Sequence, residues 1–220
     1  MSKPRICSVI IDRDDVKAAM KVQHLVDLFE VRTDLIGKHW QEVAKQLKKP
    51  WLATNRMRSE GGKWEGDEDS RVVELFKALD LGAQFVDIEL RTKNVERIVE
   101  TIKRSAKCII SFHDWKKMPS LTKLESIVRK QMGAGADICK VAAKACKFED
   151  NVTILELIGR FPKTALIALS FGPEGIVGRT LSPLMGGYLT YAAAGQGKES
   201  APGQVPVREL RKIYDLWAKG

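Results

Sequence analysis

The sequence predicts a (β/α)8 barrel, and three observations lead to that prediction. Short apolar runs rich in β-branched residues recur at intervals of about 25 residues, and each is followed by a segment with helical periodicity. Nearly every run from the second onward carries a polar residue near its carboxyl end, where barrels gather their chemistry. Eight such pairs within 220 residues fit a barrel near the lower size limit of this fold.

The elements follow in a regular order. The apolar runs predict strands over residues 6–11, 25–32, 51–56, 85–90, 107–113, 138–143, 165–171 and 188–194. The periodic segments predict helices over residues 14–24, 38–48, 67–81, 92–105, 121–134, 148–160, 175–184 and 205–218. Asp14 and Asp15 give a start signal for the first helix, and Ser120 gives one for the fifth. Glycines at positions 82, 133 and 159 stand where helices should end.

An open, doubly wound sheet is the alternative fold. Such a sheet usually has a glycine-rich, phosphate-binding turn after its first strand. Here that turn reads Asp12-Arg13-Asp14-Asp15, which is unfavourable for a phosphate. No linker, repeat or low-complexity tract divides the chain, so we expect residues 1–220 to form one catalytic barrel domain.

Composition narrows the function classes. The net charge of +9 comes from 37 basic and 28 acidic residues, but the basic residues are scattered beside acidic ones, with no aromatic-interleaved basic block. This pattern favours a small anionic substrate over a nucleic acid. Without a long apolar run or a signal-peptide pattern, we expect a cytoplasmic protein with no membrane contact. The four cysteines (Cys7, Cys108, Cys139, Cys146) form no CxxC pair, so we expect reduced thiols and no bound metal.

The most informative stretch runs over residues 107–144, where a strand, a helix and a strand predict two neighbouring parallel strands. The first strand ends in His113, which shares a face with Ser111, and the second carries Lys140 in its middle. Lys140 points opposite to Cys139, so we expect Cys139 to face the helices. A lysine inside an apolar strand is costly to leave charged, and burial favours the neutral amine, which is the nucleophilic form. His113 fits either a general base or a satisfied buried histidine.

Other polar residues belong to the same end of the predicted barrel. Their positions are Glu30 and Arg32 on strand two, Arg56 and Glu60 after strand three, Asp87 and Glu89 on strand four, and Ser170 on strand seven. A buried structural ion network is the alternative interpretation of Glu30, Arg32, Arg56 and Glu89. The last loop, residues 195–204, is glycine-rich, which is typical either of simple turns or of a mobile lid.

These residues together resemble a known family. The chain resembles type I 3-dehydroquinate dehydratase, the Schiff-base enzyme of the shikimate pathway, in the short form found in archaea. The matching pieces span the chain in the family's order: Glu30-Val31-Arg32-x-Asp34, Arg56 with Glu60-Gly61-Gly62, Asp87-Ile88-Glu89-Leu90, Ser111-x-His113-Asp114, Gly135-Ala136-Asp137-Ile138-x-Lys140, Glu174-Gly175-x-x-x-Arg179, Thr190-Tyr191-Ala192 and Ser200-Ala201-Pro202-Gly203-Gln204.

The resemblance implies a (β/α)8 lyase that converts 3-dehydroquinate to 3-dehydroshikimate without a metal or organic cofactor. It implies that Lys140 forms the imine, that His113 is the general acid and base, and that Glu60 orients His113. It also implies substrate contacts, with Arg179 as the clamp on the carboxylate and the remaining contacts made by Glu30, Arg32, Arg56, Ser200 and Gln204. Because the family often forms homodimers, the resemblance also implies a homodimer.

The chain departs from the family pattern at Leu169, Phe171, Gly178 and Met185, and its last loop is longer than in bacterial relatives by about two residues. None of these departures removes a residue with an implied role.

Two other functions are the alternatives. A class I aldolase-like lyase would share the barrel and the lysine but would add a phosphate site, and a non-catalytic barrel would bind a nucleic acid or another partner.

Overall fold

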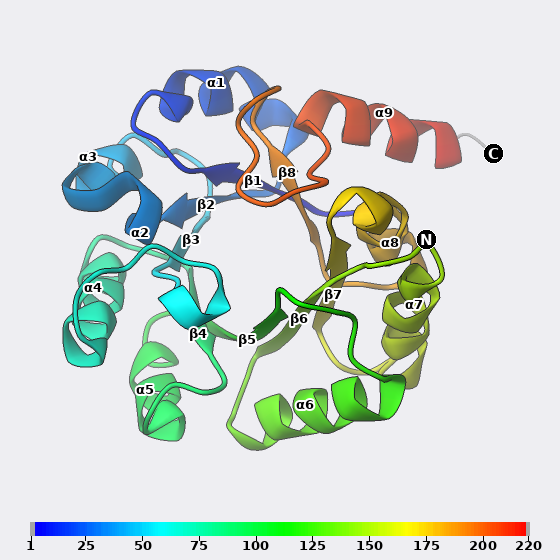
Figure 1. Ribbon diagram of the computed structural model, residues 1–220. Coiled ribbons are helices and arrows are strands. Elements are labelled where there is room, and N and C mark those ends of the chain that lie inside the picture. Colours follow the sequence, from blue (N-terminus) through cyan, green and yellow to red (C-terminus); the bar gives the residue numbers. More distant parts are fainter. Residues whose placement is uncertain (1–2, 219–220) are drawn as a thin grey trace.

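The computed structural model describes residues 3–218 and contains eight parallel strands in one sheet, curled into a barrel that the helices surround (Figure 1). The sheet order is β7-β6-β5-β4-β3-β2-β1-β8. At the seam, the Tyr188 N–H donates to the Leu166 carbonyl at 2.8 Å, which brings the chain before β8 against the start of β7. The predicted (β/α)8 barrel is therefore confirmed, and the doubly wound alternative is wrong.

The strands agree with the predicted runs to within three residues at each end, and most helices do as well. The strands are β1 Ile6–Ile10, β2 Leu28–Arg32, β3 Trp51–Thr54, β4 Phe85–Glu89, β5 Lys107–Asp114, β6 Ile138–Lys144, β7 Leu166–Phe171 and β8 Thr190–Ala193. The helices are α1 Asp15–Val22, α2 Thr33–Ile36, α3 Trp40–Ala44, α4 Glu68–Asp80, α5 Val95–Ile102, α6 Leu121–Gly133, α7 Asp150–Arg160, α8 Ile176–Leu181 and α9 Val207–Trp217.

Alternation along each strand separates two cores. Inward-facing apolar side chains fill the lower barrel, among them Cys7, Val9, Leu52, Ile109 and Ile167. Outward-facing side chains pack beneath the helices. Successive side chains on a strand point to opposite faces, so every second residue faces the barrel interior. Apolar residues fill the lower part of that interior, and the inward-facing polar residues lie in its upper part.

Strand β6 illustrates this alternation. Cys139 packs with Val128 of α6 and Ile154 of α7, as expected for a residue that faces the helices. Lys140, the next residue, therefore points into the barrel. Ser8 of β1 lies on the same side as Ile6 and Ile10, which pack beneath the helices, so it faces away from the barrel interior.

Some element ends differ from the prediction. Within the predicted helix 38–48 only α3 is α-helical, after a 3₁₀ turn over Gly37–His39, and α2 lies before this segment. Leu25, predicted to open the second strand, instead ends a 3₁₀ turn over Gln23–Leu25 that follows α1. Gly133 lies inside α6, and the left-handed turn that follows this helix is made by Gly135, with φ +88°. A left-handed residue ends a helix, and composition does not reveal which of two nearby glycines takes that role.

Two helix-start signals had different outcomes. The Ser120 hydroxyl caps α6 by accepting from the Lys123 N–H at 3.4 Å. Asp14 makes no capping bond, and the buried carboxylate of Asp15 instead accepts from the N–H groups of Ile11 and Asp12. Asp15 therefore closes the loop between β1 and α1 at the end of the barrel where the pocket lies.

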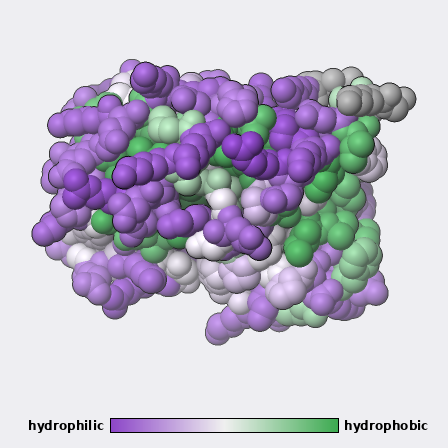
Figure 2. Space-filling model, turned by 90° about the horizontal axis from the view of Figure 1, so that it is seen from above, coloured by the Kyte–Doolittle hydropathy of each residue, from purple (hydrophilic) through white to green (hydrophobic). Residues whose placement is uncertain are grey.

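Within residues 3–218, no helix has both the length and the apolar character that crossing a membrane requires. The face formed by α1 and α9 is largely hydrophilic (Figure 2).

Candidate active site

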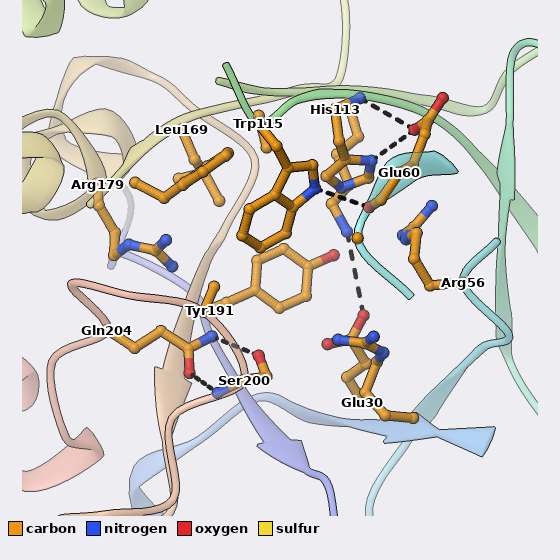
Figure 3. Close-up of a pocket in the computed structure, with 16 residues that line it drawn as sticks. Glu30, Arg56, Glu60, His113, Trp115, Leu169, Arg179, Tyr191, Ser200 and Gln204 are labelled. Atoms are coloured by element: carbon orange, nitrogen blue, oxygen red, sulfur yellow. Dashed lines mark hydrogen bonds and ion pairs between the residues drawn. The ribbon is translucent and has the colours of Figure 1, made fainter. Parts of the chain in front are cut away.

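A pocket opens at the carboxyl ends of the barrel strands, and all nine predicted site residues line it (Figure 3). They come from distant parts of the chain: Glu30, Arg32, Arg56, Glu60, His113, Lys140, Arg179, Ser200 and Gln204. Parallel strands bring their carboxyl ends to one edge, which explains how residues 170 positions apart share one cavity.

Lys140 lies at the bottom of the pocket and is only 4% exposed. Its Nζ donates to Oδ2 of Asp87 at 2.8 Å and lies 4.0 Å from Oε1 of Glu30. The same nitrogen stands 4.3 Å from the centre of the Tyr191 ring. The buried amine therefore has a carboxylate partner, and its remaining surroundings are the pocket and an aromatic face.

Asp87 was not among the predicted site residues, although the sequence places it on strand four at the same end of the barrel. Its second oxygen, Oδ1, pairs with Nη2 of Arg56 at 2.8 Å and accepts a hydrogen bond from the Ser111 hydroxyl. Burial by itself would raise the pKa of Asp87, but the charges of Arg56 and Lys140 outweigh burial and hold that pKa below its usual range. Asp87 is therefore an anion that fixes both cations.

The structural ion network considered from the sequence is present in part. Arg56 also pairs with Glu89, Nη1 to Oε1 at 2.7 Å, and both side chains are buried. Arg32 forms a two-bond pair with Asp34, at 2.9 and 2.8 Å. Pairing does not remove Arg32 or Arg56 from the pocket wall, so these guanidinium groups are held in place and still face the cavity.

His113 is oriented by Glu60. Oε2 of Glu60 accepts from the backbone N–H of His113 at 3.0 Å and lies 2.8 Å from its Nδ1. Oε1 of Glu60 pairs with Nε of Arg91 at 2.7 Å, and the Glu60 carbonyl accepts from the Trp115 indole. With Nδ1–H on the carboxylate, we assign the neutral tautomer whose Nε2 is free.

The pKa shifts of Glu60 and His113 suit His113 to act as a base. Burial raises the pKa of Glu60 to about 7, and the charge of Arg56 opposes that rise. Burial, followed by the charges of Arg56 and Lys140, lowers the pKa of His113 well below its ordinary value. The imidazole is thus neutral near pH 7, as a group that accepts a proton must be.

Among the described residues that line the pocket, Arg179 of α8 is the cation without a carboxylate partner. It is 4% exposed, its Nε has no hydrogen-bond partner among the described residues, and burial lowers its pKa to about 10. Figure 3 shows its guanidinium reaching toward the pocket from the side opposite Arg56. A buried guanidinium without a carboxylate is a ready site for an anionic group of a ligand.

The loop between β8 and α9 covers one wall of the pocket. Gln204 and Ser200 hold each other: Oε1 of Gln204 accepts from the Ser200 N–H at 2.8 Å, and its Nε2 donates to the Ser200 hydroxyl at 2.9 Å. The loop is attached to the barrel by a bond from the Gly172 N–H to the Pro202 carbonyl. The loop for which the sequence allows either simple turns or a mobile lid thus lies over the site.

Several pocket residues carried no predicted role. Tyr191, Trp115, Phe171, Leu169 and Ala142 also line the cavity, and the rings of Trp115 and Phe171 have centroids 4.5 Å apart. Inward alternation along β8 could have identified Tyr191, because it sits two positions beyond the inward-facing Leu189. Trp115 lies in a loop, where no periodicity indicates its direction.

Together these groups supply a buried amine, a neutral imidazole on a carboxylate, and a buried guanidinium that has no carboxylate partner among the described residues. The barrel and its pocket define a (β/α)8 enzyme that acts on a small anionic molecule.

Comparisons with known proteins specify this class further. The family described as type I 3-dehydroquinase matches residues 6–220. The chain is 36% identical over 214 residues to the 3-dehydroquinate dehydratase of Dehalococcoides mccartyi strain BAV1, covering 97% of this chain and 96% of that one. It is 38% identical over 205 residues to the 3-dehydroquinate dehydratase of Methanocaldococcus jannaschii, covering 91% and 92%.

A solved structure agrees with these relatives. The type I 3-dehydroquinate dehydratase of Clostridium difficile, determined with covalently modified comenic acid, superposes with a TM-score of 0.89 at 27% identity, over 100% of this chain and 94% of that one. The chain belongs to the type I 3-dehydroquinase family, and it is thereby a hydro-lyase of the shikimate pathway that acts on 3-dehydroquinate.

Proposed function

We propose that the nine pocket residues carry out the dehydration of 3-dehydroquinate to 3-dehydroshikimate through a Schiff base on Lys140. The observation that carries this assignment is the placement of the Lys140 amine, buried at the bottom of a pocket whose wall holds a neutral, oriented His113. An aldolase-like lyase or a non-catalytic barrel has no comparable support, because the family match extends over residues 6–220.

In the first step, the Lys140 ammonium gives up one proton, and its neutral amine attacks the ketone carbon of the substrate. The ketone oxygen takes that proton and one more from the nitrogen and leaves as water, so a protonated imine remains. Asp87, at 2.8 Å from Nζ, steadies the cationic form of this nitrogen before and after reaction. The imine draws electrons from the neighbouring carbon, which makes its C–H bond acidic.

In the second step, Nε2 of His113 removes that proton and an enamine forms. The enamine expels the β-hydroxyl, which leaves as water with the proton that His113 returns. Addition of water to the imine then releases 3-dehydroshikimate and restores the amine of Lys140. Glu60 acts through His113, because its carboxylate keeps Nδ1 protonated and Nε2 free.

The remaining residues bind the substrate. Arg179 takes the carboxylate, since its guanidinium is buried and unpaired within the described chain. The ring hydroxyls take positions against Glu30, Arg32, Arg56, Ser200 and Gln204, which line the same cavity. The existing bonds of these five residues hold them in place before the substrate arrives, which limits the entropy lost on binding.

The test is borohydride reduction in the presence of 3-dehydroquinate, followed by mass spectrometry of the digested protein. We expect a covalent adduct on Lys140 and none in Lys140→Ala, which should fold but not turn over. Lys144→Ala is the matched control, because Lys144 lies on the same strand and is exposed. An adduct on another lysine, or none at all, would refute the assignment.

We propose that residues 1–220 act as one catalytic domain, although residues 1, 2, 219 and 220 lie outside the described part. We also propose a cytoplasmic enzyme, since the buried Cys7, Cys108 and Cys139 are free thiols, which are typical of a reducing compartment.

A homodimer is the proposed assembly. Asn151 donates to the carbonyls of both Phe148 and Glu174, which brings the start of α7 against the start of α8. There Phe148, Val152 and Ile176 are exposed by 58%, 60% and 43%. Such clustered apolar exposure is typical of an interface. Light scattering should give the mass of two chains, and Val152→Glu should give the mass of one; a monomeric parent protein would refute the dimer.

A further inference from the structure

Tyr191 is a pocket residue for which the proposed mechanism gives no role. It lies on β8, where it pairs in register with Cys7 of β1, and its ring packs inside the barrel with Cys7 and Leu189. The side chain is 4% exposed, and the surface that remains belongs to the pocket.

Its hydroxyl is buried without a hydrogen-bond partner among the described residues. The contrast with Tyr214 is direct, because that buried hydroxyl donates to the Thr180 carbonyl at 2.9 Å. Burial raises the pKa of Tyr191 well above its ordinary value, so the group stays protonated and remains a donor. A buried donor without an acceptor is unfavourable unless a ligand supplies the acceptor.

The position of the ring tells which part of a ligand this donor would meet. The Tyr191 ring centre is 4.3 Å from Nζ of Lys140, the atom that would bond the ketone carbon of the substrate. A protonated imine remains cationic, so it keeps the attraction to the ring face that the ammonium has. In Figure 3 the hydroxyl points across the pocket, away from Arg179 and therefore away from the expected site of the carboxylate.

We propose that Tyr191 is a further substrate-binding residue, whose hydroxyl donates a hydrogen bond to the substrate hydroxyl on the carbon next to the imine carbon. This inference rests on the proposed function, because it takes Lys140 as the imine nitrogen. 3-Dehydroquinate bears a hydroxyl on one side of its ketone, and the carbon on the other side loses its proton to His113. Tyr191 thus selects keto acids with a hydroxyl at that position.

The experiment compares Tyr191→Phe with the parent enzyme, using 3-dehydroquinate and the analogue that lacks the hydroxyl next to the ketone. The variant keeps the ring beside Lys140 and removes only the donor. Tyr188→Phe is the matched control, because Tyr188 is at the opposite end of the barrel, under the Arg5 guanidinium. Melting temperature without substrate and borohydride labelling of Lys140 are measured on each protein.

For Tyr191→Phe we expect KM for 3-dehydroquinate to rise about tenfold, since a hydroxyl of the substrate loses its donor. With the analogue, KM should change by less than about twofold, since the contact is already missing. The melting temperature should not fall, because an unpaired buried hydroxyl has been removed. Tyr188→Phe should match the parent enzyme with both substrates.

Two results would overturn the inference. One is an unchanged KM for 3-dehydroquinate in Tyr191→Phe, and the other is an equal rise in KM for both substrates, which would mean that the donor meets a different group. Failure of the proposed function looks different, because the parent enzyme itself would then give no borohydride adduct on Lys140.

Discussion

A single oxygen of Glu60 holds His113 twice, at its backbone N–H and at its Nδ1, with distances of 3.0 and 2.8 Å. The double contact fixes both the position of strand β5 at that point and the rotation of the ring. Because the carboxylate is itself buried and held by Arg91, the ring cannot turn without losing its hydrogen bond to a fixed acceptor. His113 therefore presents Nε2 to the pocket in a defined direction.

The dependence of the rate on pH should reflect this pair. Burial raises the pKa of Glu60 to about 7, so its carboxylate gains a proton as the pH falls through that value and no longer fixes the Nδ1–H tautomer. We therefore expect kcat/KM to fall about tenfold for each pH unit below 7. In Glu60→Gln, kcat/KM should be low and should lack this titration. A pH profile like that of the parent enzyme would show that Glu60 does not act through His113.

Replacing His113 with alanine removes the base and leaves the amine. We expect kcat to fall by about 10²–10⁴-fold, the usual effect of losing a general base, while borohydride still labels Lys140. Steady-state rates and mass spectrometry measure the two effects. His39→Ala is the control, since His39 is on the surface beside Glu42 and should leave kcat unchanged. If His113→Ala turned over substrate as fast as the parent enzyme, His113 would not be the general base.

Arg179→Ala should raise KM for 3-dehydroquinate about a hundredfold, because a buried charge-assisted pair with the substrate carboxylate is lost. Arg179→Lys should recover only part of this, since an ammonium cannot form the planar two-bond pair. Arg160→Ala is the control, an exposed arginine paired with Glu156 on α7. An unchanged KM in Arg179→Ala would assign the carboxylate to another cation.

Asp87→Ala should destabilise the protein strongly. The carboxylate pairs with Lys140 and with Arg56, both at 2.8 Å, and its removal leaves two buried cations without it. Breaking a buried ion pair costs about 3–5 kcal/mol, which urea unfolding followed by fluorescence can measure. Asp80→Ala, at the exposed end of α4, should change the unfolding free energy by less than about 0.5 kcal/mol. Equal stability of the two variants would contradict this.

Gly203→Ala should disturb the lid. Gly203 has φ +80°, and an added Cβ would lie 2.4 Å from the Gly172 carbonyl oxygen, so the loop must shift. Because Ser200 and Gln204 flank this position, we expect KM to rise by about tenfold or more. Gly195→Ala, in the same loop, meets nothing within 4 Å and should have parent-like kinetics. Equal KM values for the two variants would show that the lid position does not matter.

Much of this molecule could be predicted from the sequence because its signals are local. Alternation of apolar strands and periodic helices predicted the barrel, and parity along β6 correctly placed Cys139 toward the helices and Lys140 inside. The motif pieces predicted nine residues that the structure brings into one pocket. Their catalytic and binding roles remain proposals.

The tertiary structure alone decided the relationships between residues on different elements. The sequence placed Asp87 on strand four at the end of the barrel that carries the site, but only the closed barrel gave it Lys140 and Arg56 as partners. Likewise, no local pattern says that the Tyr191 hydroxyl is left without an acceptor, because hydrogen-bond satisfaction depends on every neighbour. Periodicity fixes which way a side chain points; the register and curvature of the closed sheet determine what it meets there.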